Sequence, residues 1–332
     1  MEKIIRYVEP QVRYRQKDIT HDLAPYLLGL TYTDYAHGKA DDLELRLADP
    51  ERLWIKDWYP AKGDQIEAQL TLHISDIQKT LRCGLFEIDE IEINGFPLEV
   101  TIRAHSALVT KDLRLTKKTR AWENTSLRKI AQEIASGAGL TLLFDGEDHQ
   151  FKRIDQVDEP DLAFLKRLCE KTGHYLKVAH EKLIISEKTF SEGGVLAGEI
   201  KPEDILSLSF TDKTHRIYKK CKVSYWDAQK KKLLTYEEQD PNAPETGETL
   251  IVNERVESLS DAIKLAKKRL KMTNRFKIEG EVKIPGSVEF VAGVSVMLKN
   301  FGILSGKYAV EESRHEYSRS GYITTLKLRR LA

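Results

Sequence analysis

The glycine-rich segment Gly302-Ile-Leu-Ser-Gly-Lys-Tyr is the nearest approach in the sequence to a phosphate-binding loop. Such a loop cradles phosphates with backbone N–H groups and uses a Ser or Thr after its lysine to bind Mg²⁺. The segment is one residue short between its glycines, and Tyr308 occupies the position of that Ser or Thr. Because strands are expected on both sides of it, the segment is interpreted as a hairpin turn.

Gly137-Ala-Gly139 is a second short glycine motif. It lacks the third glycine of a dinucleotide-binding fingerprint, and it follows an expected helix rather than a strand. It also lacks the serine that an esterase nucleophile elbow carries between its glycines. The segment is therefore interpreted as a helix end.

The nine histidines show no metal-binding spacing, since none belongs to a His-Glu-x-x-His or Cys-x-x-Cys arrangement. His174 and His180 flank an expected passage from helix to hairpin and are interpreted as surface or turn residues. A dense acidic stretch lacks the alternating ligands of an EF-hand, so a turn followed by a helix start explains it better. Its acids are Asp145, Glu147, Asp148, Asp155, Asp158, Glu159 and Asp161.

Trp54, Trp58 and Tyr59 could form a platform for stacking sugars. Pro60 and Gly63 follow directly and enforce a bend, which favours the alternative that these rings anchor the core at a barrel corner.

A basic stretch with interleaved aromatic residues could contact nucleic acid. It contains Lys219, Lys220, Lys222, Lys230, Lys231 and Lys232, with Tyr225 and Trp226 between them. Strand alternation places several of these lysines in water, where they protect a sheet edge from aggregation, and this interpretation is favoured. The sequence thus predicts no catalytic, cofactor-binding or metal-binding residue, and no enzymatic activity.

The composition is that of a folded protein with a heavily charged surface. The 332 residues include 53 basic and 52 acidic side chains, and the net charge of +1 provides no global field for nucleic acid or an anionic membrane. Cys83, Cys169 and Cys221 lie in apolar patterns and are expected to be reduced core thiols, as in a cytoplasm. No signal peptide and no apolar run of about 20 residues is visible, so stable membrane insertion is not expected.

The elements that would position any site are organised by an internal repeat. The stretch from Gly63 to Arg103 is similar to the stretch from Gly293 to Arg329. The paired positions are Phe86 with Tyr308, Ile88 with Val310, Val100 with Leu326, Ile102 with Leu328, and Arg103 with Arg329. Amphipathic strands also resemble one another by chance, but the ordered set favours a duplicated small β-domain.

Both copies lose the phase of their apolar alternation at the same place. Phe86 and Ile88 are followed by Ile91 and Ile93, and Tyr308 and Val310 are followed by His315 and Tyr317. An alternation of period two that skips one residue is typical of a β-bulge, which bends a strand.

Other periodicities predict the remaining elements. Alternating apolar residues predict strands throughout 26–108, with a hairpin at Asn94-Gly95, and again at 206–210 and 221–226. Helices are predicted from Asn124 to Gly137, from Asp158 to Gly173 with Pro160 in the first turn, and over 258–273 with Leu259, Ile263, Ala266 and Leu270 inward. A hairpin is expected over 175–186, and the polar, proline-rich segment 240–247 is expected to be a mobile surface loop.

The predicted fold class is α+β, mainly β, with two similar small tube-like β-barrel domains and an α/β unit between them. Residues 1–110 are assigned to the first barrel and 111–195 to the small α/β middle domain. Residues 196–332 are assigned to the second barrel, which includes one helix and the long loop near 240–247.

Several segments in their order resemble the late control protein D family of contractile phage tails. Asp42-Leu-Glu-Leu-Arg-Leu-Ala-Asp and Trp58-Tyr-Pro-Ala-Lys-Gly-Asp-Gln-Ile resemble the family's opening barrel. Segments 119–131 and 158–173 resemble its middle unit, and Ser260-Asp-Ala-Ile-Lys-Leu-Ala-Lys-Lys-Arg-Leu, followed by Val294-Ser-Val, resembles its closing barrel. The resemblance covers nearly the whole chain.

This resemblance implies a structural baseplate hub, a homotrimer that joins the hexameric tail tube to the trimeric spike. The implied partners are further copies of the chain, tail tube protein, spike protein and other baseplate proteins, with nucleic acid only in passage. Two similar barrels in each of three chains would give six near-equivalent modules around one axis. The expected location is the baseplate of a virion or tail-like particle assembled in the bacterial cytoplasm, and because the sequence stops at Ala332 the spike is expected to be a separate polypeptide.

Two alternatives remain. The first is a cell-wall-binding or peptidoglycan-degrading tail protein, suggested by the aromatic cluster near Trp54 and by the compact 112–190 unit. The second is a fragment of a type VI secretion spike.

Overall fold

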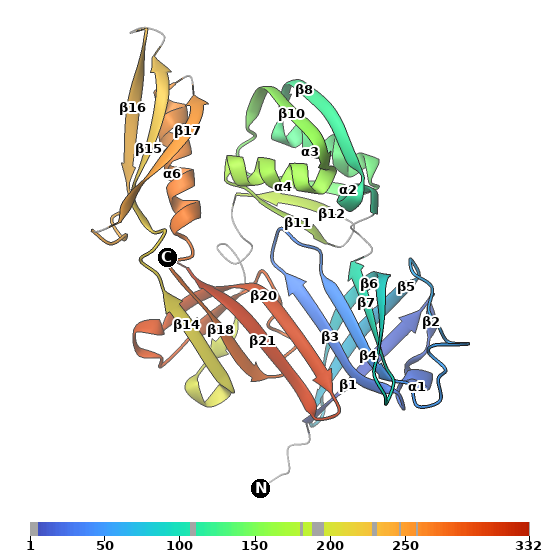
Figure 1. Cartoon of the computed structure of the whole chain (residues 1–332). Helices are drawn as coiled ribbons and strands as arrows, with labels where there is room; N and C mark the ends of the chain where they lie inside the picture. Colours follow the sequence, from blue (N-terminus) through green and yellow to red (C-terminus); the bar gives the residue numbers. More distant parts are fainter. Residues whose placement is uncertain are drawn as a thin grey trace.

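A computed structural model describes residues 6–106, 111–179, 182–187, 196–227, 231–245, 247–256 and 258–331 (Figure 1). Strands dominate, as predicted from the sequence. No helix among the described residues is long and apolar enough to cross a membrane. The three cysteines are free and buried.

The first β-unit is formed by the N-terminal third of the chain. Its elements are β1 (Arg6–Tyr14), β2 (Lys17–Asp18), α1 (Thr20–Leu23), β3 (Leu27–Tyr35), β4 (Asp42–Ala48), β5 (Gln65–Ile74), β6 (Ile77–Asn94) and β7 (Glu99–Ser106). The apolar members of each alternating strand face one core, in which Leu30, Leu45, Leu70 and Phe86 are almost completely buried. The predicted hairpin at Asn94-Gly95 joins β6 and β7, and Gly95 has a positive φ of 53°.

The second β-unit repeats this arrangement near the C-terminus. Its elements are β13 (Leu196–Ile200), η1 (Pro202–Asp204), β14 (Ser207–Asp212), β18 (Ile278–Pro285), β19 (Ser295–Leu298), η2 (Gly302–Leu304), β20 (Gly306–Ser318) and β21 (Gly321–Arg330). Val282, Tyr308, Val310 and Leu326 lie in its separate core. The glycine segment 302–308 connects β19 to β20, so its interpretation as a turn between strands is confirmed.

Identical backbone contacts relate the two units. Gly63 N donates to Ile88 O at 2.7 Å, and Gly293 N donates to Val310 O at 2.8 Å. The φ angles of Gly63 and Gly293 are 90° and 91°. Residues that carry a Cβ atom adopt such positive φ angles only at a cost in conformational energy. The predicted repeat is therefore present in three dimensions.

The predicted bulges lie at equivalent places. The β6–β7 register shifts between Ile88 and Glu90, and the β20–β21 register shifts between Val310 and Glu312. Asp89 and Glu311 are therefore the two bulged residues.

The residue equivalence predicted for the last strand of each copy was wrong by two positions. Ile88 lies opposite Ala104, and Val310 lies opposite Leu328, which makes Ala104 and Leu328 equivalent. The corrected pairs are Ile102 with Leu326 and Arg103 with Lys327. A shift of two residues keeps every side chain on its face, so an apolar pattern cannot detect it.

The middle unit contains α2 (Lys111–Leu115), β8 (Lys117–Ser126), α3 (Leu127–Gly137), β9 (Thr141–Asp145), β10 (Gln150–Pro160), α4 (Asp161–Thr172), β11 (Tyr175–Ala179) and β12 (Lys182–Ser186). The two helices and the β11–β12 hairpin confirm the prediction. However, α4 begins after Pro160 rather than at Asp158, because β10 pairs with β8 up to Pro160.

A helix and three strands inserted in the second β-unit form a core of their own. They are β15 (Tyr218–Asp227), β16 (Lys232–Gln239), β17 (Glu248–Val256) and α6 (Leu259–Asn274). The predicted inward face of α6 needs correction, because Leu259 is 47% exposed whereas Ala262 is fully buried. Near the 240–247 loop, Asn274 Nδ2 donates to Asp240 Oδ2 at 2.7 Å, so this part of the loop is bonded to the end of α6.

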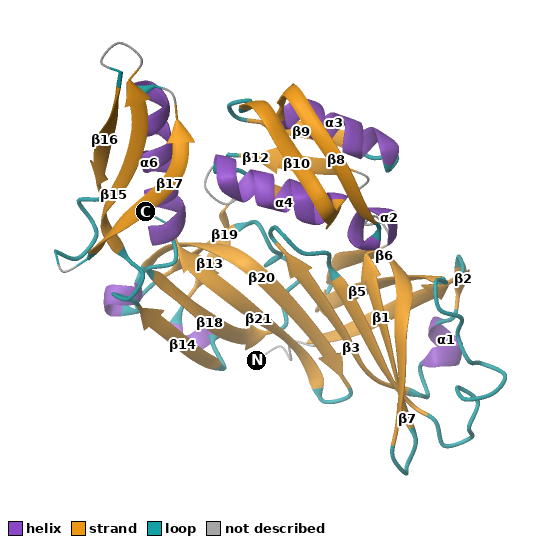
Figure 2. Ribbon diagram, turned by 45° about the horizontal axis from the view of Figure 1, so that its top comes forward, coloured by secondary structure: helices purple, strands orange, loops and turns teal. Residues whose placement is uncertain are grey.

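The strands of both β-units belong to one 13-stranded sheet, which Figure 2 shows beneath the middle unit and the unit of β15, β16, β17 and α6. β20 of the second unit pairs with β3 of the first. Within the described strands neither unit closes on itself through a backbone ladder, so the prediction of two barrels is not confirmed.

Candidate assembly interface

The two β-units meet along one antiparallel ladder, here called the internal joint. It comprises residues 29–35 of β3 and 312–318 of β20, in the register Tyr35↔Glu312 to Gly29↔Ser318. The first part of β20 pairs with β19, and the bulge at Glu311 turns the remainder of the strand toward β3.

Buried aromatic rings fill the joint. The rings of Tyr32 and His315 are stacked with centroids 5.9 Å apart, and both residues are buried. His315 Nε2 lies 2.9 Å from Ser313 Oγ, and its Nδ1 lies 2.8 Å from the Tyr322 hydroxyl. Burial lowers the pKa of His315 to about 4, so the neutral ring is the form that packs here.

Glu311, the bulged residue, is the electrostatic centre of the joint. It accepts hydrogen bonds from His37 Nε2 at 2.8 Å and from Arg329 Nε at 2.5 Å, while its backbone carbonyl accepts from Ala36 N at 2.9 Å. Burial raises its pKa, but the His37 hydrogen bond and the Arg329 charge outweigh burial and bring the pKa to about 2. Glu311 therefore remains a carboxylate at neutral pH and links three segments.

Asp34 connects the joint to the middle unit. Its Oδ2 accepts from Ala292 N at 2.9 Å, and its Oδ1 accepts from Lys177 Nζ of β11 at 2.9 Å. Burial, and then the charge of Asp34, raise the pKa of the neighbouring Asp41. The middle unit is thus attached directly above the place where the two β-units meet (Figure 1).

Both components of the joint occur a second time, each with one edge that pairs with no strand in the described part of the chain. β14, the counterpart of β3, pairs only with β18 and forms an end of the sheet. The outer part of β6, residues 89–94, is the counterpart of residues 311–316 of β20; it pairs with β7 on one side, whereas β5 ends its pairing at Glu87. On this segment Ile93 is 45% exposed. The molecule thus presents two strand edges of the kind that join its own halves.

A short repeated segment in the sequence marks these edges, and it was not among the predictions. Leu30-Thr-Tyr-Thr-Asp-Tyr-Ala-His37 at the joint is repeated as Leu208-Ser-Phe-Thr-Asp-Lys-Thr-His215 at the free edge. The β3–β4 pair Leu30↔Leu45 corresponds to the β14–β18 pair Leu208↔Val282, which fixes this alignment in the structure. The signal could have been found by searching for the repeat before Gly63.

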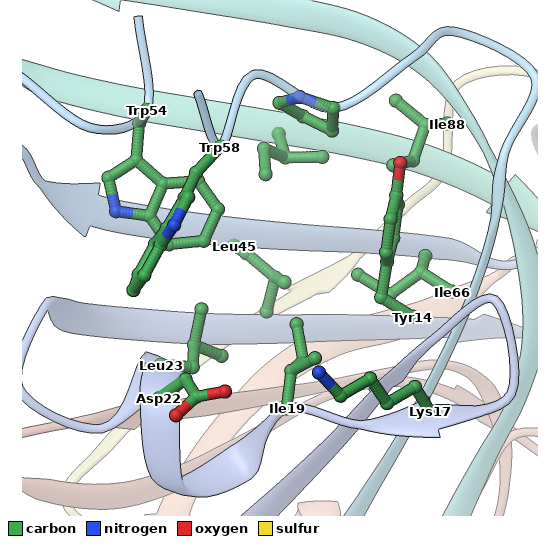
Figure 3. Close-up of a pocket in the computed structure, with 12 residues that line it drawn as sticks. Tyr14, Lys17, Ile19, Asp22, Leu23, Leu45, Trp54, Trp58, Ile66 and Ile88 are labelled. Carbon is green, nitrogen blue, oxygen red and sulfur yellow. The ribbon is translucent and has the colours of Figure 1, made fainter. Parts of the chain in front are cut away.

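The aromatic cluster near Trp54 lines a cavity of about 270 Å³ (Figure 3). Trp54 is buried, as the core-anchoring interpretation predicted. The interpretation was wrong for Trp58 and Tyr59, which are 40% and 48% exposed. The plane of the Trp58 ring makes an angle of 85° with the Trp54 ring and 84° with the Tyr26 ring. The two tryptophans therefore pack edge to face and do not form a flat surface on which sugars could stack. Ile66, Ile88 and Leu45 complete an apolar wall.

The described lysines of the basic stretch are largely paired with acids. Lys219 Nζ lies 2.8 Å from Glu245, and Lys220 and Lys222 lie 3.7 and 3.9 Å from Glu237. Lys230 lies outside the described residues. The side chains of Lys220 and Lys222 are 41% and 45% exposed, as expected for solvated lysines, whereas that of Lys219 is only 14% exposed. The prediction that these three lysines protect a sheet edge was wrong, because β15 lies between β16 and β17 in its sheet.

The histidines and acids singled out earlier have mainly structural contacts. His174 lies in the turn between α4 and β11, as predicted, but it is buried rather than at the surface, with Nδ1 2.8 Å from Thr172 Oγ1. His180 lies outside the described residues. Asp161 is buried and accepts from Lys118 Nζ at 2.8 Å. Within the described segments no group of three or more His, Cys, Asp or Glu side chains could hold a metal ion.

Comparisons with known proteins agree with the architecture. Two solved tail proteins share the fold with TM-scores of 0.70: the 43 kDa tail protein of prophage MuSo2 from Shewanella oneidensis, at 14% identity, and a tail protein from Neisseria meningitidis, at 13%. The alignments cover 97% and 98% of this chain, and 98% and 96% of those chains. A component of the Escherichia coli type VI secretion system shares the fold at a TM-score of 0.58 and 11% identity, over 92% of this chain and 74% of that one.

Sequence relatives identify the family. The probable baseplate hub protein of Escherichia phage P2 is 32% identical over 60% of this chain and 50% of its own length, and that of Escherichia phage 186 is 31% identical over 59% and 48%. The chain thus matches about half the length of these relatives. The profile of the phage tail baseplate hub family matches residues 65–321, which is most of the sequence. The chain therefore belongs to the phage tail baseplate hub family.

Proposed function

We propose that this protein is a trimeric adaptor at the centre of a contractile tail baseplate, where it joins the sixfold tail tube to the threefold spike. The observation that carries the proposal is the repeated β-unit, with the same Gly63–Ile88 and Gly293–Val310 backbone contacts in both copies. Three chains with two such units each present six similar modules on one face and remain threefold on the other. The role is structural, and no catalytic residue is invoked.

The proposal also assigns the parts of the chain. Residues 1–110 and 196–332 carry the two tube-like units, which would complete a barrel wall only in the assembly, and residues 111–195 form the middle domain. Separate hydrophobic cores in the two β-units and in the middle unit support this division. Assembly in the bacterial cytoplasm and incorporation into a virion tail or a tail-like particle belong to the same proposal.

Light scattering on the purified chain, alone and with tail tube protein, tests the adaptor. A trimer, or a trimer capping a tube ring, is the expected result. A monomer at every concentration that also fails to bind tube protein would refute the proposal.

A cell-wall-binding protein is the second candidate, and its support is the cavity beside Trp54 and Trp58. A peptidoglycan pull-down and turnover assay separates the two roles, with a Trp58→Ala variant as the matched control. Retention of the wild-type chain on peptidoglycan, lost in Trp58→Ala, would favour the wall-binding role. A type VI spike fragment is distinguished by whether the neighbouring reading frame encodes a needle or a tube protein.

A further inference from the structure

We infer that two copies of this chain join by repeating the internal joint, with β14 of one copy adding to residues 89–94 of β6 in the next. The inference rests on the proposed function for the number of copies, but the contact itself follows from the repeat. The occupant of each open edge is thus a second copy of this chain.

The register of the contact between copies follows from the register of β3 and β20 in the internal joint. Within the chain His315 lies opposite Tyr32, and Arg314 lies opposite Thr33. The equivalent positions place Ile93 opposite Phe210 and Glu92 opposite Thr211 of the neighbouring copy. The same alignment continues with Glu90 opposite Lys213, two opposite charges at directly facing positions.

Backbone geometry leaves β14 ready for this pairing. Lys213 N donates to Lys277 O on the β18 side. Since backbone groups of successive strand residues point to opposite edges, those of Phe210 and Asp212 point to the open edge. Phe210 is only half-buried, and Ile93, which would face it, is 45% exposed. An unpaired strand edge flanked by apolar side chains is a template for strand addition.

The polar contacts of the joint also have equivalents. His37, which hydrogen-bonds the bulged Glu311, corresponds to the exposed His215, and Glu311 corresponds to the bulged Asp89. Asp89 lies 3.4 Å from His105 Nε2, as Glu311 lies beside Arg329. His215 of one copy would therefore reach Asp89 of the next.

Asp212 would accept a backbone hydrogen bond across the contact between copies, as its counterpart Asp34 does within the chain. Asp34 accepts from Ala292 N, the residue before Gly293. The corresponding residue before Gly63 is Lys62, so Asp212, which is exposed in the single chain, would accept from Lys62 N of the neighbour. A contact between two different surfaces of neighbouring copies forms a closed ring when the rotation from one copy to the next adds up to a full turn. With three copies, the ring would contain six β-units, two from each copy.

Disulfide trapping tests the register in the full-length chain. Glu92 and Thr211 would form a pair without mutual backbone hydrogen bonds, with Cα atoms about 4.5–5.5 Å apart, which suits a disulfide. The double variant Glu92→Cys/Thr211→Cys should form covalent multimers on mild oxidation, in a ladder that ends at the trimer. The matched control is Glu92→Cys/Ser209→Cys, which places the cysteines on the same face but one two-residue step apart, about 7 Å along the strand.

The outcomes separate this inference from the adaptor function. If light scattering shows a trimer but disulfides form in the Glu92/Ser209 variant, or in neither variant, the β6–β14 register is refuted. The trimeric hub would still be supported by that result. A chain that stays monomeric even with tube protein overturns both. Trapping only in the Glu92/Thr211 variant supports both.

A charge deletion provides a second measurement. Asp212→Ala removes a carboxylate that would accept a backbone hydrogen bond across the contact, and it should weaken self-association about ten- to a hundredfold. Asp57→Ala, at an exposed acid outside both edges, is the control and should leave association unchanged. Equal association of the two variants would argue against the contact.

Discussion

Replacement of Glu311 by glutamine should destabilise the two β-units together, because this carboxylate binds groups from both sides of the internal joint. In the folded chain its pKa is lowered from 4.5 to about 2 by His37 and Arg329, against the effect of burial. At about 1.4 kcal/mol per pKa unit, the ionised form contributes about 3 kcal/mol to stability at pH 7. Removal of one member of a buried ion pair has a similar cost, about 3–5 kcal/mol.

The pH dependence follows from the sign of the shift. A carboxyl group whose pKa is lower in the folded than in the unfolded state stabilises the fold above its unfolded pKa, and this stability is lost as the pH falls through its folded pKa. The free energy of unfolding of the wild type should therefore exceed that of Glu311→Gln by about 3 kcal/mol at pH 7. This difference should shrink between pH 4.5 and about 2.

Urea denaturation followed by circular dichroism measures this difference. Glu316→Gln is the matched control on the same strand, because Glu316 forms only a partly exposed ion pair with Arg314 at 3.2 Å. The free energy of unfolding of Glu316→Gln should fall by less than about 1 kcal/mol relative to the wild type. A loss below about 1 kcal/mol for Glu311→Gln, or a loss that does not change from pH 7 to pH 3, would refute the electrostatic account of the joint.

Three further predictions test the repeat and its packing. Because burial lowers the pKa of His315 to about 4, protonation opposes folding, and His315→Phe should flatten the decline of wild-type stability from pH 6.5 toward 4; an unchanged slope in urea titrations would contradict this. Gly63→Ala and Gly293→Ala should each lower the free energy of unfolding, measured by thermal denaturation, by about 1–2 kcal/mol, since both positions have φ near 90°. Clearly different losses for the two variants would argue against equivalent backbone strain at the two positions. Phe86→Ala should cost about 3–5 kcal/mol while the exposed Ile77→Ala stays within about 0.5, and comparable losses would place Phe86 outside the core.

Much of the fold could be predicted because apolar alternation and capping residues act locally. The helices that became α3 and α4, the Asn94-Gly95 turn and both bulges carry short-range signals. The strand pairing of β8 with β10 was missed, because a polar strand has little periodicity to recognise. The exposure of Leu259 was missed because the partner of the helical face was unknown.

The candidate interface was harder to predict than the fold. Asp34, Glu311 and His315 belong to no motif, and their roles depend on strands that are far apart in the sequence. The repeated Thr-Asp-x-x-His segments at Thr33 and Thr211 were visible in the sequence, but only the register of β3 and β14 shows what they have in common.

The sequence by itself determined the family, the mainly β composition and the presence of two related units, because these depend on residue order and local alternation. Only the tertiary structure decided the register of the repeat and the pairing of β3 with β20, which joins both units in one sheet. A two-residue slip changes no apolar face, so the choice depends on backbone hydrogen bonds and buried ion pairs between distant segments.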